Sequence, residues 1–113
     1  MISHKSVYDE KNISDGKWVL VERLWPRGIK KEKIDIWMKE VAPSNELRKW
    51  YSHELNKWEE FRQRYTEELK SNQKVRDLLE IIKKEKTTIV YATKDYDHSG
   101  AKVLIEYLEN LLL

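Results

Sequence analysis

The sequence predicts a small three-layer α/β domain, with a short and mostly parallel sheet flanked by helices. Two almost continuously apolar runs, at residues 18–21 and 87–92, are typical of central strands buried on both faces. Between and after these runs, apolar residues recur at three- and four-residue steps, which favours amphipathic helices. Strands that alternate with helical segments build a layered α/β domain.

A shorter strand is expected at the amino terminus. Ile2, Val7 and Tyr8 supply its apolar positions, and the charged run at 9–11 ends it. About eight residues then lead to the strand at 18–21, fewer than the dozen or so of a usual parallel crossover. The sequence therefore leaves a hairpin open as an alternative to a crossover.

Five helical segments are expected. A short and poorly patterned helix at 34–41 stops before Pro43, and Ser44 is placed to cap a second short helix that runs through Trp50. Longer apolar stripes, with charged residues between them, indicate helices over 55–69, 75–82 and 103–112.

Composition narrows the class of protein. A chain of 113 residues suits one domain over 1–113, and a net charge of +2 argues against a general nucleic-acid or membrane-surface binder. The absence of cysteine removes disulfides, thiolate metal sites and cysteine nucleophiles. No apolar stretch resembles a signal peptide or could span a bilayer, so a cytoplasmic protein is expected.

The first candidate site follows the strand at 18–21. Arg23 and Arg27 flank a Trp-Pro pair, and Gly28 permits tight backbone geometry. Guanidinium groups in this setting suit a phosphate or a carboxylate, which they can hold through two parallel hydrogen bonds. The structural alternative is that Arg23 pairs with a buried carboxylate such as Glu22 or Asp95.

The second candidate site links the last strand to the last helix. The free N–H groups at the start of that helix form an anion site, to which Lys94 adds charge. His98 is a candidate acid or base, with Asp95 beside it. Ordinary capping is the alternative for Ser99 and Asp97, and for both it is the better interpretation.

Other chemistries find little support. No histidine spacing resembles a zinc signature, so no metal site is expected, and no cofactor is indicated. A triad of Ser99, His98 and Asp95 lacks the glycine pattern of a nucleophile elbow. Trp50 and Tyr51 could stack on bases, but aromatic residues at helical spacing more often lie in a core.

Three segments together resemble a known family, the YeaO-like proteins of bacteria and archaea (domain of unknown function four-eighty-eight). They are Val21-Glu22-Arg23-Leu24-Trp25-Pro26-Arg27-Gly28, then Ala42-Pro43-Ser44-Asn45-Glu46-Leu47-Arg48-Lys49-Trp50 with His53 and Trp58, then Tyr91-Ala92 through Asp95 and His98. The resemblance covers essentially the whole chain. It implies a mostly parallel sheet, which favours the crossover, and it implies no established activity. Its shared polar positions fall on Arg23, Arg27, Ser44, Glu46, Arg48, His53, Asp95 and His98.

The chain departs from that family at several positions. Glu22 stands where relatives commonly have Asp, Ser99 where they have Asn, and Gly100 where a second His is frequent. Longer relatives tend to place a cysteine near the last corner. Because this chain has none, thiol chemistry is excluded and His98 has no neighbouring imidazole.

The leading hypothesis is a polar pocket for an anionic small molecule, a nucleotide or a phosphorylated metabolite, at the carboxyl ends of the strands. Arg23, Arg27 and Arg48 would hold the anion, helped by Gly28, Lys94 and Ser99, while His98 and Asp95 orient it or move a proton. Whether a reaction occurs is left open, as are the oligomeric state and the role of His53. The alternatives are a protein-interaction module using Trp25, Trp50 and Trp58, and a single-stranded nucleic-acid binder.

Overall fold

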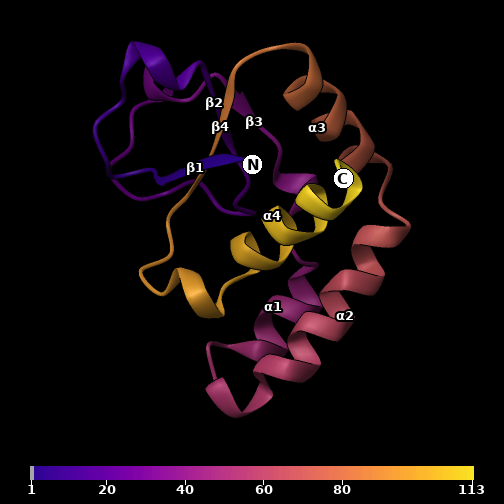
Figure 1. Ribbon diagram of the computed structural model, residues 1–113. Coiled ribbons are helices and arrows are strands. Elements are labelled where there is room, and N and C mark those ends of the chain that lie inside the picture. Colours follow the sequence, from indigo (N-terminus) through magenta and orange to yellow (C-terminus); the bar gives the residue numbers. More distant parts are fainter. Residues whose placement is uncertain (1) are drawn as a thin grey trace.

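A four-stranded parallel sheet organises the molecule. The computed structural model describes residues 2–113, and its strands are β1 (Ser3–Ser6), β2 (Lys17–Leu20), β3 (Ile36–Trp37) and β4 (Thr87–Tyr91). Their order is β1-β4-β2-β3, and every neighbouring pair is parallel (Figure 1). The last strand thus lies between the first two, with Val19 beside Ile89. The hairpin alternative is wrong, and the predicted parallel sheet is confirmed.

The helices largely follow the predicted stripes. They are α1 (Asn45–Tyr51), α2 (Trp58–Lys70), α3 (Gln73–Lys84) and α4 (Gly100–Leu111). Ser44 caps α1 as predicted, because its Oγ accepts a hydrogen bond from the N–H of Leu47 at 3.2 Å. Glu68 on α2 accepts from both the N–H and the hydroxyl of Ser44, so α2 holds the start of α1 in place.

The prediction of a helix at 34–41 is wrong. Strand β3 occupies its centre, between 3₁₀ turns at Lys31–Lys33 and Lys39–Val41. The N–H groups of Asp35 and Met38 donate to the carbonyls of Trp18 and Leu20 in β2. Ladder bonds to a buried strand therefore override the weak helical pattern of this segment.

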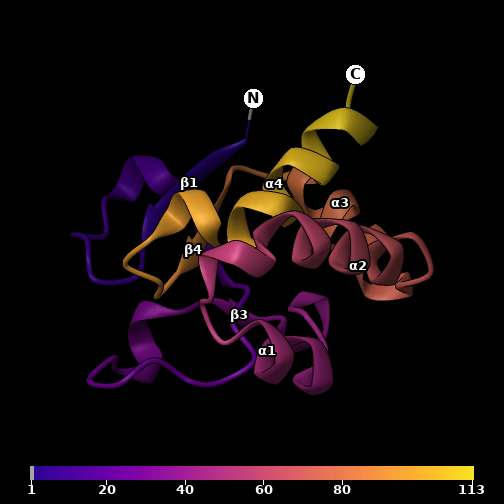
Figure 2. The same cartoon turned by 90° about the horizontal axis from the view of Figure 1, so that it is seen from below.

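The two faces of the sheet are covered differently. Helices α2, α3 and α4 gather to one side of the strands (Figures 1 and 2), and the side chains of Val19 and Ile89 lie in the core that they form. On the other face, Trp18, Leu20 and Val90 are fully buried. A loop covers that face through Trp25, Ile29 and Ile34. The α/β class is confirmed, with this loop as its third layer.

A buried carboxylate anchors the amino-terminal end of β2. Asp15 accepts hydrogen bonds from the Asn12 N–H, the Lys5 ammonium and the Trp18 indole N–H, at 2.9, 2.9 and 3.0 Å. The Asn12 N–H, followed by Lys5, lowers the pKa of Asp15 to about 2. Its ionised form therefore stabilises the fold above about pH 4, and that contribution is lost as the pH falls towards 2.

Candidate functional site

The candidate site lies at the edge of the sheet where the parallel strands end. Beyond this edge, Glu22 follows β2 and the segment from Ala92 to Asp95 follows β4. The Glu22 carboxylate accepts a hydrogen bond from the Ala92 N–H at 2.8 Å, which ties the two strand ends together. Ligands of open α/β sheets bind at such an edge, because loops and helix N-termini diverge there.

A small inner cavity of about 110 Å³ opens beside these strand ends. Its walls include residues from the segment after β2, from α1, from the turn after α1 and from the start of α4: Glu22, Arg48, Tyr51, His53, Ser99 and Gly100. The cavity is well below the roughly 300–1,000 Å³ typical of pockets for whole drug-sized ligands, so it fits a small group rather than a whole nucleotide.

A wider outer cleft of about 520 Å³ continues from the inner cavity. Glu22, Tyr51, His53 and Thr93 belong to the walls of both hollows, so these residues mark their junction. The outer walls also contain Leu55, Lys94 and Asp95. The two hollows together offer room for a small group attached to a larger body.

The guanidinium of Arg23 is bound to the backbone and has a structural role. Its Nε and Nη2 donate to the backbone carbonyls of Pro43 and Ala42, each at 3.0 Å. Neither Glu22 nor Asp95 forms an ion pair with it, so the expected carboxylate partner is replaced by backbone oxygens. Arg23 thereby fixes the segment that leads into α1 and forms one wall of the cavity.

Arg27 and Gly28 lie away from the cavity. The hydroxyl of Tyr8, just beyond β1, donates to the Arg27 carbonyl at 3.0 Å, and neither Arg27 nor Gly28 belongs to the walls of the two hollows. Gly28 has a φ of 78°, a left-handed conformation that disfavours other residues. The structure brings Arg48, Lys94, Asp95 and Ser99 to the cleft, and leaves Arg27 and Gly28 on the loop.

Ser99 caps α4. Its Oγ accepts from the Lys102 N–H at 3.4 Å and its hydroxyl donates to the Tyr96 carbonyl at 2.7 Å. The N–H groups of Gly100 and Ala101 have no hydrogen-bond acceptor within residues 2–113, and both residues border the inner cavity. Asp97, the other capping candidate, instead pairs with Lys102 at 3.6 Å.

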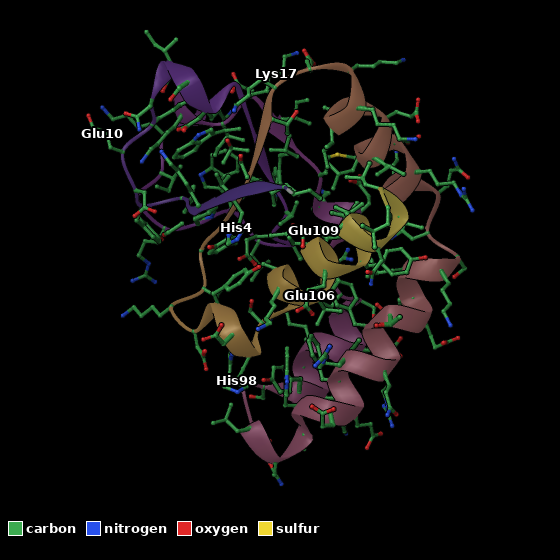
Figure 3. The ribbon with its side chains drawn as sticks, in the orientation of Figure 1. His4, Glu10, Lys17, His98, Glu106 and Glu109 are labelled. Atoms are coloured by element: carbon green, nitrogen blue, oxygen red, sulfur yellow. The ribbon has the colours of Figure 1, made fainter. Side chains whose placement is uncertain are left out.

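His98 lies at the corner before α4 (Figure 3) and forms a half-exposed pair with Asp95. The His98 Nδ1 lies 3.0 Å from the Asp95 carboxylate, and the imidazole edge meets the ring of Trp58. The hydroxyl of Tyr51 donates to the His98 carbonyl at 2.8 Å, and burial raises the pKa of Tyr51. His98 itself lies outside the walls of both hollows.

His53 emerges as a site residue to which no sequence pattern assigned a role. It follows Ser52 in a left-handed turn, with φ values of 57° and 45°. Positive φ is uncommon for residues other than glycine, and such strain tends to cluster at functional sites. The turn brings the imidazole to the junction of the two hollows, 5.8 Å from the ring of Tyr51.

Other features of the surface carry less chemistry. A hollow of about 360 Å³ between α2 and α4 contains Arg62 and Glu106, but these two side chains pair with each other at 3.5 Å. Within residues 2–113, no group of three or more His, Asp or Glu side chains is arranged to hold a metal ion. None of the helices in that range has the length and apolar character needed to cross a bilayer.

Comparison with known proteins agrees with the resemblance found in the sequence. The family model described as "Inactive DUF488-N3 subclade" matches residues 1–113. The chain is similar to the uncharacterised protein YeaO of Escherichia coli K12, with 42% identity over 113 residues, 97% of this chain and 98% of YeaO. An uncharacterised protein of Mycobacterium tuberculosis H37Rv is 41% identical over 104 residues, 90% of this chain and 88% of that protein. No solved structure matches the chain.

Proposed function

The chain belongs to the inactive DUF488-N3 subclade, and on this premise we propose that it binds a small anionic molecule without transforming it. The ligand is a nucleotide or a phosphorylated metabolite, held at the carboxyl ends of β2 and β4. The observation that carries this proposal is the inner cavity, whose walls include Arg48 together with Gly100 and Ala101, two residues whose N–H groups lack acceptors within residues 2–113.

These donors suit one anionic group. Arg48 offers several N–H donors, of which only one is used by an acceptor in the described part of the chain, in a 3.3 Å bond to Asn45. The first N–H groups of α4 point out of a helix whose dipole favours negative charge at this end. His53 adds a third kind of donor at the mouth of the cavity. The body of the ligand would extend into the outer cleft, past Lys94 and the exposed side chain of Leu55.

Two observations favour binding over catalysis. His98, the candidate acid or base, lies outside the walls of both hollows, and its Nδ1 is occupied by Asp95. The description of the family as inactive points the same way. The proposed role is therefore that of a binding protein, with the His98–Asp95 pair stabilising the corner before α4.

The tryptophans give the interaction-module alternative less support. Trp25 donates to the Ile29 carbonyl at 2.8 Å and packs on the buried core of the loop face. The cations of Lys57 and Arg64 cover the ring of Trp50, at 5.0 and 4.5 Å from its centre. Rings that are already covered in this way offer little apolar surface to a partner.

The proposal is tested by the thermal stability of the chain in the presence of inorganic phosphate and adenosine monophosphate. A ligand at ten times its Kd stabilises a protein by about 1.4 kcal/mol, which corresponds to a rise in Tm of several degrees. Arg48→Ala should abolish this rise. Arg27→Ala removes the same charge from the loop and should leave the rise intact.

Two results would overturn the proposal. One is the absence of any rise in Tm for the unmodified chain. The other is a rise in Tm that is lost in Arg27→Ala and kept in Arg48→Ala.

A separate measurement tests whether binding occurs without transformation. A ligand that is recovered chemically altered after a day with the protein would contradict it, and NMR spectra of the ligand detect such a change. An affinity that collapses as salt is raised would instead favour the nucleic-acid alternative.

A further inference from the structure

Glu22 is a carboxylate without a cationic partner among the side chains of residues 2–113. Its Oε2 accepts the Ala92 N–H at 2.8 Å, and no other donor within residues 2–113 reaches either oxygen. Each of the ion pairs formed in this range involves other residues. The backbone bond fixes the carboxylate and leaves its Oε1 free.

The position of Glu22 makes this free oxygen significant. The side chain is half-buried and borders both the inner cavity and the outer cleft. The other carboxylate of the cleft, Asp95, is already paired with His98 at 3.0 Å. A partly desolvated charge without a counter-ion is costly, and a cationic group brought by a ligand would offset that cost.

Opposite charges therefore stand in sequence along the site. Arg48 and the free N–H groups of α4 border only the inner cavity, whereas Glu22 stands at its junction with the outer cleft. An anionic head in the inner cavity would place the next few atoms of the ligand beside Glu22. An ammonium group at that point would donate to the free oxygen.

We propose that the ligand of this cleft is a small anion that also carries a protonated amine, with the amine held by Glu22. This inference rests on the proposed function and adds to it the class of ligand. It selects aminoalkyl phosphates, or amino acids if the head is a carboxylate in place of the proposed phosphate, over anions with apolar or purely hydroxylated tails, because only the former complement both charges of the site.

The test compares matched ligands by calorimetry on the full chain. Phosphoethanolamine is paired with propyl phosphate, in which CH₃ replaces NH₃⁺, and β-alanine is paired with butyrate in the same way. The aminated member of at least one pair should bind about tenfold more tightly, since close charge pairs at interfaces are measurably coupled. The pair that binds shows whether the head is a phosphate or a carboxylate.

Glu22→Gln separates the role of the charge from that of the shape. The glutamine carbonyl can still accept from Ala92, so unfolding by urea should be little changed, while the preference for the amine should fall below twofold. Glu32→Gln removes the same charge from the exposed 3₁₀ turn Lys31–Lys33 and should keep the preference. Equal affinity for both members of each pair, or a preference that survives Glu22→Gln, would overturn this inference and leave the proposed function intact. Failure of all four ligands to bind would also overturn this inference, while the rise in Tm with phosphate or adenosine monophosphate decides the proposed function separately.

Discussion

The segment after β2 and the corner before α4 leave the same edge of the sheet, yet they use their polar groups in opposite ways. On the first segment, the Arg23 guanidinium holds two backbone carbonyls and the Trp25 indole holds a third. At the corner, the N–H groups of Gly100 and Ala101 lack acceptors within residues 2–113, and both residues border a cavity. The Arg23 side chain, which satisfies backbone carbonyls, helps to build the wall of the cavity. The backbone N–H groups that lack acceptors are the ones available to a ligand.

The largest effect is expected at Arg23. Arg23→Ala removes two hydrogen bonds from a charged donor and leaves the carbonyls of Ala42 and Pro43 without it. We expect a loss of about 3 kcal/mol in the free energy of unfolding, measured by urea denaturation. Arg27→Ala is the matched control and should change that free energy by less than about 0.5 kcal/mol. Equal effects of the two substitutions would contradict a structural role special to Arg23.

Gly100→Ala sharpens the comparison at the corner. A Cβ at position 100 would lie 2.9 Å from Cγ of Pro43, whose carbonyl Arg23 holds. Because the Pro43 ring is rigid, overpacking should lower the free energy of unfolding by about 1–2 kcal/mol. Thermal denaturation measures this loss. An unchanged Tm would show that the wall formed by Pro43 is more compliant than its contacts indicate.

Gly28→Ala probes the loop without any steric contact. Nothing lies within 4 Å of a Cβ built there, so the cost comes only from the φ of 78°. The free energy of unfolding should fall by about 1 kcal/mol, and phosphate binding should be unchanged. Gly28→Asn should cost less, because asparagine tolerates the left-handed region better than alanine. The reverse order of these two variants would rule out backbone strain as the cause.

The smallest effect is expected at Asp95. Its pairing with His98 is half-exposed, and exposed ion pairs contribute between 0 and about 1 kcal/mol. Asp95→Asn should therefore change the urea midpoint far less than Arg23→Ala does. A loss as large as that of Arg23→Ala would mean that the corner, too, is held together by its charged groups.

The sequence reveals the framework better than the site. Apolar runs identify β2 and β4, and Ser44 is recognisable as a cap, because these signals are local. The helix predicted at 34–41 is replaced by strand β3, because its pairing partner in β2 lies some 17 residues earlier and only tertiary pairing makes the segment a strand.

The site depends still more on distant contacts. Arg23 was expected to bind a ligand, but its acceptors are backbone carbonyls about 20 residues along the chain, and no sequence pattern identifies a backbone acceptor. His53 had only its place among the polar positions of the family resemblance. Its contribution follows from a left-handed turn at the end of α1, which two non-glycine residues form. The sequence also predicts a site at the corner from Lys94 to Ser99, from its place between a strand and a helix. Lys94, Asp95 and Ser99 border the hollows there, and His98 does not.

An NMR titration of the isotopically labelled chain with phosphate tests most directly whether the cleft, and not the loop, holds the anion. The amide signals of Gly100 and Ala101 should shift in a saturable way, together with those of His53 and Thr93, while the signals of Arg27 and Gly28 stay in place. Saturable shifts confined to Arg27, Gly28 and their neighbours would contradict the account and return the anion site to the loop after β2.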